Sequence, residues 1–244
     1  MDKTFLTYNE WKETAKTLHL LLQIIAKIRM EHNGKHPEWI HGCMSLTING
    51  LTTGIIADEH SSFEIAFNLK KHHISMHNAD GRKVHIRLQD GVSIAQYYRQ
   101  IQHALGYIGA PTAIEFHPLD FGLPADFERD ESPRRYDETA VNLFQKNLLF
   151  AYSVLDKYLS LPAVNGGAPV YHIEAMELSC SICNKGGHLP KLSFHPGNAK
   201  MPIPSFLVTY VHETRILTLE EALLAADSEA RIMEFFSDSL KSFG

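Results

Sequence analysis

Hydrophobic residues recur at helical spacing near the start of the chain. They return every three or four positions, which is typical of one buried helix face, at Trp11, Ala15, Leu18, Leu22 and Ile25. Thr7-x-x-Glu10 ahead of this run has the spacing of a capping box. Asn33-Gly34 and Pro37 then interrupt the pattern. We therefore predict a long helix that begins just after Thr7 and runs to about Met30.

Alternating hydrophobic and polar residues follow and predict antiparallel strands. The clearest alternation covers residues 63–69, and two similar runs carry Ile74 and Ile86. Asn78-Ala79-Asp80-Gly81 between those runs is typical of a type I turn with Gly81 in the left-handed conformation. Weaker alternation predicts strands over residues 43–49, 170–183 and 206–211, and it is compatible with an edge strand over 112–116.

Three further helices complete the predicted order. Ser93 is placed to cap one, Asp137 begins another, and the capping box Thr218-x-x-Glu221 opens the last, with a break at Asp227-Ser228. Hairpins and terminal helices indicate an α+β fold, with a largely antiparallel sheet flanked by long amphipathic helices. The long connection over residues 117–136 predicts two halves, 1–122 and 123–244, packed as one compact unit.

Composition is that of an ordinary globular protein. Of 244 residues, 44% are hydrophobic and 21% are charged, which argues against a disordered chain. The net charge of −5 does not favour a nucleic-acid or membrane-surface binder, and the longest apolar run is too short to cross a membrane. Three cysteines make no disulfide framework, and the N-terminus does not resemble a signal peptide. We expect a cytoplasmic protein.

Several motifs in order resemble a bacterial family known as domain of unknown function 5996. The opening signature is Trp11-x-x-Thr14-x-x-Thr17-Leu18-His19 and Gln23-Ile24-x-x-Lys27-Ile28-Arg29. It is followed by Trp39-x-His41, Gly50-Leu51-Thr52-Thr53, Phe63-Glu64-Ile65-x-Phe67 and Tyr136-Asp137-x-x-Ala140, with looser matches at Pro169-Val170 and Phe194-x-Pro196-Gly197. The resemblance covers nearly the whole chain. It implies a bacterial cytosolic setting but no activity.

This chain departs from the family pattern at two positions. The family tends to carry tryptophan where this sequence has Ile40 and His195. If those aromatic residues line a pocket in the family, the pocket of this member is altered.

The first candidate site lies on the opening helix and the segment after it. His19, Gln23 and Lys27 are four residues apart, so they share one helix face, and Arg29 follows closely. A cation at Lys27 or Arg29 is suited to an anionic group, with His19 or His41 as acid or base and Trp39 beside them. The alternative is a solvated helix face without a ligand.

The second candidate site is a set of metal-ligand side chains late in the chain. Cys180, Cys183, His188 and His195 are residue types that bind Zn²⁺. The signal is incomplete because a strong zinc site would show a second close pair, and residues three apart on a strand face opposite sides. A redox pair or two ordinary thiols remain alternatives, and no other cofactor is evident.

Three functions stay open from the sequence. The one we favour is binding of a small, anionic molecule in a cleft beside the first helix. The second is a metal-assisted enzyme using some of the 15 histidines, of which 11 precede residue 123. The third is a structural or protein-interaction module, as a monomer or homodimer. Dinucleotide-binding, P-loop and common hydrolase motifs are absent from the sequence.

Overall fold

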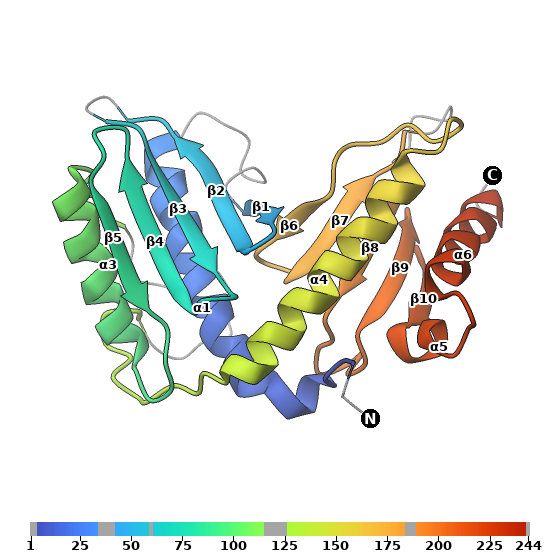
Figure 1. Cartoon of the computed structure of the whole chain (residues 1–244), viewed down its shortest axis with the longest axis horizontal. Coiled ribbons are helices and arrows are strands. Elements are labelled where there is room, and N and C mark those ends of the chain that lie inside the picture. The colour runs from blue at the N-terminus through green and yellow to red at the C-terminus, as the bar shows by residue number, and fades with distance from the viewer. Residues whose placement is uncertain (1–3, 34–41, 59–60, 115–125, 184–188, 243–244) are drawn as a thin grey trace. The chain divides into compact units, whose positions relative to one another are not determined.

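The computed structural model describes residues 4–33, 42–58, 61–114, 126–183 and 189–242. These residues form helices and antiparallel strands in two compact units, which confirms the α+β prediction (Figure 1). The α1 unit comprises Lys12–Asn142 with His172–Ala175, and the α4 unit comprises Met1–Trp11, Leu143–Tyr171 and Met176–Gly244. The expected division at residues 122 and 123 stays a prediction.

The α1 unit consists of a five-stranded antiparallel meander and two helices. The strands pair in chain order and are β1 (Cys43–Thr47), β2 (Gly50–Ile56), β3 (Phe63–Asn68), β4 (His73–Asn78) and β5 (Lys83–Arg87). Helix α3 (Ile94–Ile108) packs on β4 and β5. Helix α1 (Tyr8–Asn33) reaches β1 through Arg29, while His32 packs edge-on against Phe63 of β3.

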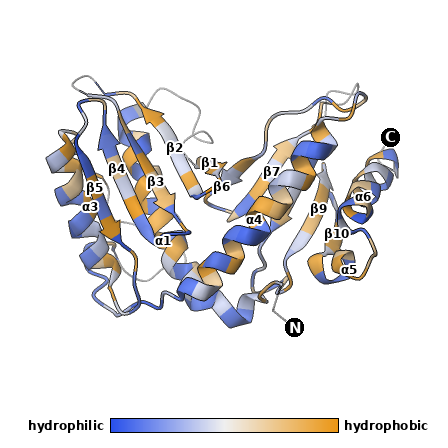
Figure 2. Ribbon diagram, viewed as in Figure 1, coloured by the Kyte–Doolittle hydropathy of each residue, from blue (hydrophilic) through white to orange (hydrophobic). Residues whose placement is uncertain are grey.

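Local sequence explains these elements. Along β3, buried and half-buried residues alternate, as the hydrophobic pattern predicts. Helix α3 begins with a complete capping box, in which Ser93 accepts from the Gln96 backbone N–H and the Gln96 side chain accepts from the Ser93 N–H. The same helix carries a hydrophobic and a hydrophilic side (Figure 2). The turn before β5 also forms, with Gly81 at φ +87° and its N–H donating to the Asn78 carbonyl oxygen.

Helix α1 is buried over a longer stretch than its apolar stripe predicts. Every residue from Leu20 to Ile28 is buried, including Gln23 and Lys27. The helix also runs one turn beyond the predicted end at Met30, to Asn33. Polar side chains on the middle of this helix therefore lie inside the protein.

The α4 unit carries the second group of strands and the remaining helices. Antiparallel strands β7 (Glu177–Ser181), β8 (Lys191–His195), β9 (Ser205–Tyr210) and β10 (Glu213–Thr218) pair in chain order. Helices α4 (Glu138–Leu159), α5 (Leu219–Leu223) and α6 (Ser228–Ser242) complete the unit, and α6 packs on β9 and β10. Fully buried Phe206 holds this core together through ring contacts with Phe150, Phe194 and Phe236.

The predicted strands differ from the structure in three respects. The single strand expected over residues 170–183 is two, β6 (Val170–His172) and β7, because the chain turns between them at Met176, with φ +50°. Strands β8 and β10 were not predicted, since prolines flank β8 and four of the six β10 residues are exposed, which hides the alternation. Thr112–Ile114 form no strand, and residues 115–116 lie outside the described residues.

Candidate functional site

Polar side chains gather around the last two turns of α1. Arg29 and His32 are three residues apart, so they project from neighbouring positions, about 60° apart around the helix axis. Each contacts a different partner segment of the α1 unit. We call the resulting set of Arg29, His32, Cys43, Asp58, Thr112 and His172 the helix-end cluster.

Arg29 is the cation of the helix-end cluster. Its side chain is half-buried, and Nη1 donates a hydrogen bond to the backbone carbonyl oxygen of Cys43 in β1. Its Nε atom is buried and has no hydrogen-bond partner within the described part of the chain. Burial lowers the pKa of the guanidinium, and the nearby Cys43 thiol opposes that effect. The guanidinium stays charged because its ordinary pKa is so high.

Cys43 and His172 form a second contact in the helix-end cluster. The Cys43 Sγ atom lies 3.3 Å from Nδ1 of His172, which lies in β6. Burial raises the pKa of the Cys43 thiol, and the charge of Arg29 opposes the rise. This thiol is therefore held in its neutral form at pH 7, which is unlike the activated thiolates of cysteine enzymes.

His32 lies between a carboxylate and a hydroxyl. Its Nδ1 atom is 3.0 Å from Oδ2 of Asp58, and its Nε2 atom is 2.7 Å from Oγ1 of Thr112. The ring packs at 77° against the Phe63 ring, with centroids 5.0 Å apart. Both imidazole nitrogens are thus engaged, and the ring orientation is set from three sides.

The polar stripe predicted on α1 lies elsewhere on the helix. His19 and Gln23 contact each other, with Nε2 atoms 3.2 Å apart, and Gln23 and Lys27 are buried while His19 is half-buried. A solvated helix face therefore does not describe these three residues. Lys27 projects about 200° around the axis from Arg29, so the two cations do not share a face. Trp39 and His41 lie outside the described residues.

The side chains considered for zinc show separate environments. Cys180 is buried in β7, which raises the pKa of its thiol to about 12, whereas Cys183 is exposed. Nδ1 of half-buried His195 accepts from the Gly197 N–H at 2.9 Å, and His188 lies outside the described residues. In the part of the chain that the structure describes, no group of three or more His, Cys, Asp or Glu side chains could hold a metal ion.

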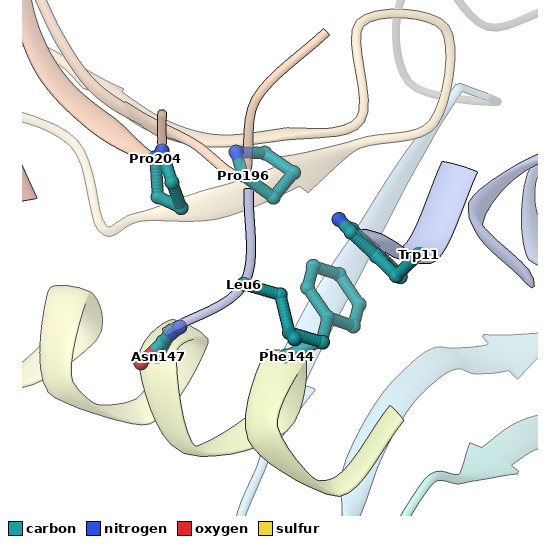
Figure 3. Close-up of a pocket in the computed structure, with 6 residues that line it drawn as sticks. All are labelled: Leu6, Trp11, Phe144, Asn147, Pro196 and Pro204. Carbon is teal, nitrogen blue, oxygen red and sulfur yellow. The ribbon is translucent and has the colours of Figure 1, made fainter. Parts of the chain in front are cut away.

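The hollows among the described residues of the α4 unit share no lining residue with the helix-end cluster. One is bordered by Leu6, Trp11, Phe144, Asn147, Pro196 and Pro204 (Figure 3). Its volume of about 10 Å³ admits a water molecule and no organic ligand. A larger hollow of about 420 Å³ has mainly apolar walls, including Leu161, Ile182 and Leu240, with Cys183 at its border. The described residues that line it form no constellation of acid and base groups.

Sequence reasoning found Arg29 but missed most of the helix-end cluster. His32 could have been found, because it stands one helical turn after Arg29. Thr112 is 80 positions beyond His32, and neither it nor Asp58 belongs to a recognisable motif. Only the fold brings these three residues into contact.

A comparison with protein families accounts for the motifs in the first two thirds of the sequence. The model of a family of unknown function, DUF5996, matches residues 4–166, which is most of the chain. The chain belongs to the DUF5996 family. Five members of the helix-end cluster fall within the DUF5996 match, and His172 lies beyond it. No curated protein and no solved structure matches the chain. Among the described residues of this DUF5996 protein, no helix is both long and apolar enough to cross a membrane.

Proposed function

We propose that the α1 unit binds a small anionic molecule beside the end of α1, with Arg29 as its cationic contact. The observation that carries this proposal is the buried Nε–H group of Arg29, which has no acceptor within the described residues. A buried donor without a partner costs about 1–3 kcal/mol, and an anion would remove that cost. A binding role explains why the fold retains such a group.

The geometry of Arg29 suits a carboxylate or a phosphate. A guanidinium offers donors in a planar fork that matches two oxygens of such a group. In Arg29 the bond from Nη1 to the Cys43 carbonyl oxygen fixes the plane of this fork. Partial burial also lowers the local dielectric, so an anion there would be held more strongly than at the protein surface.

Lys27 offers a second cationic position, which the test must separate from Arg29. It is buried, with 8% of its surface exposed, on the side of α1 that carries His19 and Gln23. His19, Gln23 and Lys27 would contact the ligand only if it bound on that side. The two positions therefore predict different mutational results.

The test is thermal unfolding of the full chain with 0–20 mM inorganic phosphate or citrate. An anion present at one hundred times its Kd would stabilise the protein by about 2.7 kcal/mol. For a chain of this size that corresponds to a rise in Tm of roughly 5–10 °C. We expect the rise in the wild type and its loss in Arg29→Gln.

Arg82 provides a matched control. Its Nη1 also donates to a backbone carbonyl oxygen, that of Tyr107 at 3.0 Å, but the side chain is exposed. Arg82→Gln should keep the full rise in Tm. An unchanged rise in Arg29→Gln, or no rise with either anion, would refute the proposal. Loss in Lys27→Gln alone would place the ligand on the other side of α1 and overturn the assignment to Arg29.

A further inference from the structure

Three side chains of the helix-end cluster form a continuous line of polar contacts. Asp58 Oδ2 lies 3.0 Å from Nδ1 of His32, and Nε2 of the same ring lies 2.7 Å from Thr112 Oγ1. Asp58 follows β2, His32 lies in the last turn of α1 and Thr112 follows α3, so three separate segments supply the groups. A carboxylate, an imidazole and a hydroxyl in this order are the parts of a nucleophile with its general base.

The hydrogen-bonding pattern leaves the imidazole able to accept a proton. With the Nδ1 proton donated to Asp58, the lone pair of Nε2 points to Thr112 Oγ1. The hydroxyl also lies 2.9 Å from the Ala110 carbonyl oxygen, and its single proton can be donated to either acceptor. Rotation of that proton toward Nε2 leaves a lone pair of Oγ1 available to attack a carbonyl carbon.

Burial distinguishes this line of groups from an ordinary surface pair. The side chains of His32 and Asp58 are 11% and 17% exposed, and Thr112 is 7% exposed. His77 and Glu64 form a more exposed pair for comparison. Nε2 of His77 lies 3.2 Å from Oε2 of Glu64, and the two side chains are 45% and 30% exposed. Nδ1 of His77 has no hydrogen-bond partner in the described part of the chain, so its imidazole lacks the hydroxyl contact that His32 has with Thr112.

We infer that Thr112 is a nucleophile for acyl transfer, with His32 as its general base and Asp58 as the group that orients His32. Thr112 Oγ1 attacks the carbonyl carbon of an ester, and its proton passes to Nε2 of His32. The bond to the leaving alcohol breaks, and the alcohol oxygen takes that proton. Water then cleaves the acyl-threonine through His32, which releases a carboxylic acid and restores the hydroxyl.

The neighbouring cation indicates the class of ester. Arg29 projects from α1 one turn before His32, so its guanidinium is suited to hold a negative group of the substrate near the reacting carbonyl. The substrate class is therefore a small ester that carries a carboxylate or phosphate. This assignment of the substrate rests on the proposed function, whereas the activated hydroxyl stands on its own geometry.

The experiment is labelling of the purified full chain with a small neutral alkyl fluorophosphonate, followed by intact and peptide mass spectrometry. Reaction forms an Oγ1–P bond and releases fluoride, with His32 taking the hydroxyl proton. We expect one adduct, on Thr112, and none at that position in the isosteric Thr112→Val. Thr112→Ser should react faster because a primary hydroxyl is less hindered. His32→Ala should lower the labelling rate about 100-fold or more.

Controls separate this inference from a purely structural role and from the proposed function. His77→Ala should label at the wild-type rate, because it removes a histidine that pairs with a carboxylate outside the helix-end cluster. The absence of an adduct in both the wild type and Thr112→Ser, each shown to be folded by its melting curve, would refute the inference. Labelling does not need Arg29, so an adduct without anion binding refutes only the proposed function. Anion binding without an adduct refutes only the nucleophile.

Discussion

Replacing Gly50 by alanine should destabilise the α1 unit strongly, because the backbone there leaves no room for a side chain. Gly50 opens β2 with φ +146°, a conformation that residues other than glycine rarely adopt. An added Cβ would lie 2.1 Å from the Phe67 carbonyl oxygen and 2.9 Å from the Leu69 nitrogen. These are backbone atoms of the neighbouring chain segment, where the Leu69 N–H donates to the Asn49 carbonyl oxygen at 2.8 Å.

The magnitude follows from two contributions. Holding alanine at this backbone conformation costs about 1–3 kcal/mol. Moving the Phe67–Leu69 segment away breaks one or two backbone hydrogen bonds, which are each worth about 0.5–1.5 kcal/mol. The sum is a loss of about 2–6 kcal/mol in the free energy of unfolding, a large share of the stability of an ordinary domain.

Gly54 in the same strand is a matched control. Its φ is also positive, at +63°, but an added Cβ would meet nothing within 4 Å. Gly54→Ala should therefore cost only the backbone contribution, about 1–2 kcal/mol. Urea unfolding followed by circular dichroism would give both values. Equal losses in the two variants would refute the argument from close approach, because only Gly50 has atoms to clash with.

Three further predictions concern other parts of the fold. Burial lowers the pKa of His72, so its folded-state pKa lies below the unfolded value near 6.5. The unfolded state then binds more protons, and stability should fall as pH drops from 7 through 6.5 toward the folded-state pKa. Asparagine tolerates the φ of +53° at this position, so His72→Asn should fold and should reduce the pH dependence of the free energy of unfolding, measured by urea titrations at pH 7 and 5. An unchanged pH dependence would exclude His72 as its source. Ser93→Ala removes the α3 cap and should cost about 1 kcal/mol by urea unfolding, whereas a loss under 0.3 kcal/mol would contradict the capping role. Phe206→Ala empties a fully buried position among three rings and should cost about 3–5 kcal/mol in the same assay, with Phe206→Leu costing less.

Helices were predictable where local signals agreed. Ser93 caps α3 and the Thr218 capping box forms, both as the sequence indicates, and α6 begins at Ser228 after the expected break. Strands were less predictable, because β10 is mostly exposed and its residues do not alternate. A strand depends on pairing with distant residues, so its sequence pattern weakens where one face is not buried.

The candidate site also contains one residue that the sequence predicted and others that it did not. Arg29 was predicted from its place on the first helix, and its separation from Lys27 follows from helix geometry alone. The partners of His32 were not predictable, since Asp58 and Thr112 come from loops after β2 and α3. No local pattern relates residues that meet only after the sheet and helices have packed.

The sequence by itself determined the α+β class, the long first helix, the N-terminal caps of α3 and α5 and the DUF5996 family, because these depend on contacts within a few residues or on motifs in order. Only the tertiary structure decided that Gln23 and Lys27 are buried, that Arg29 has a buried donor without a partner, and that His32 joins Asp58 to Thr112. Burial and side-chain alignment depend on how distant segments pack, and that information is spread over the whole chain.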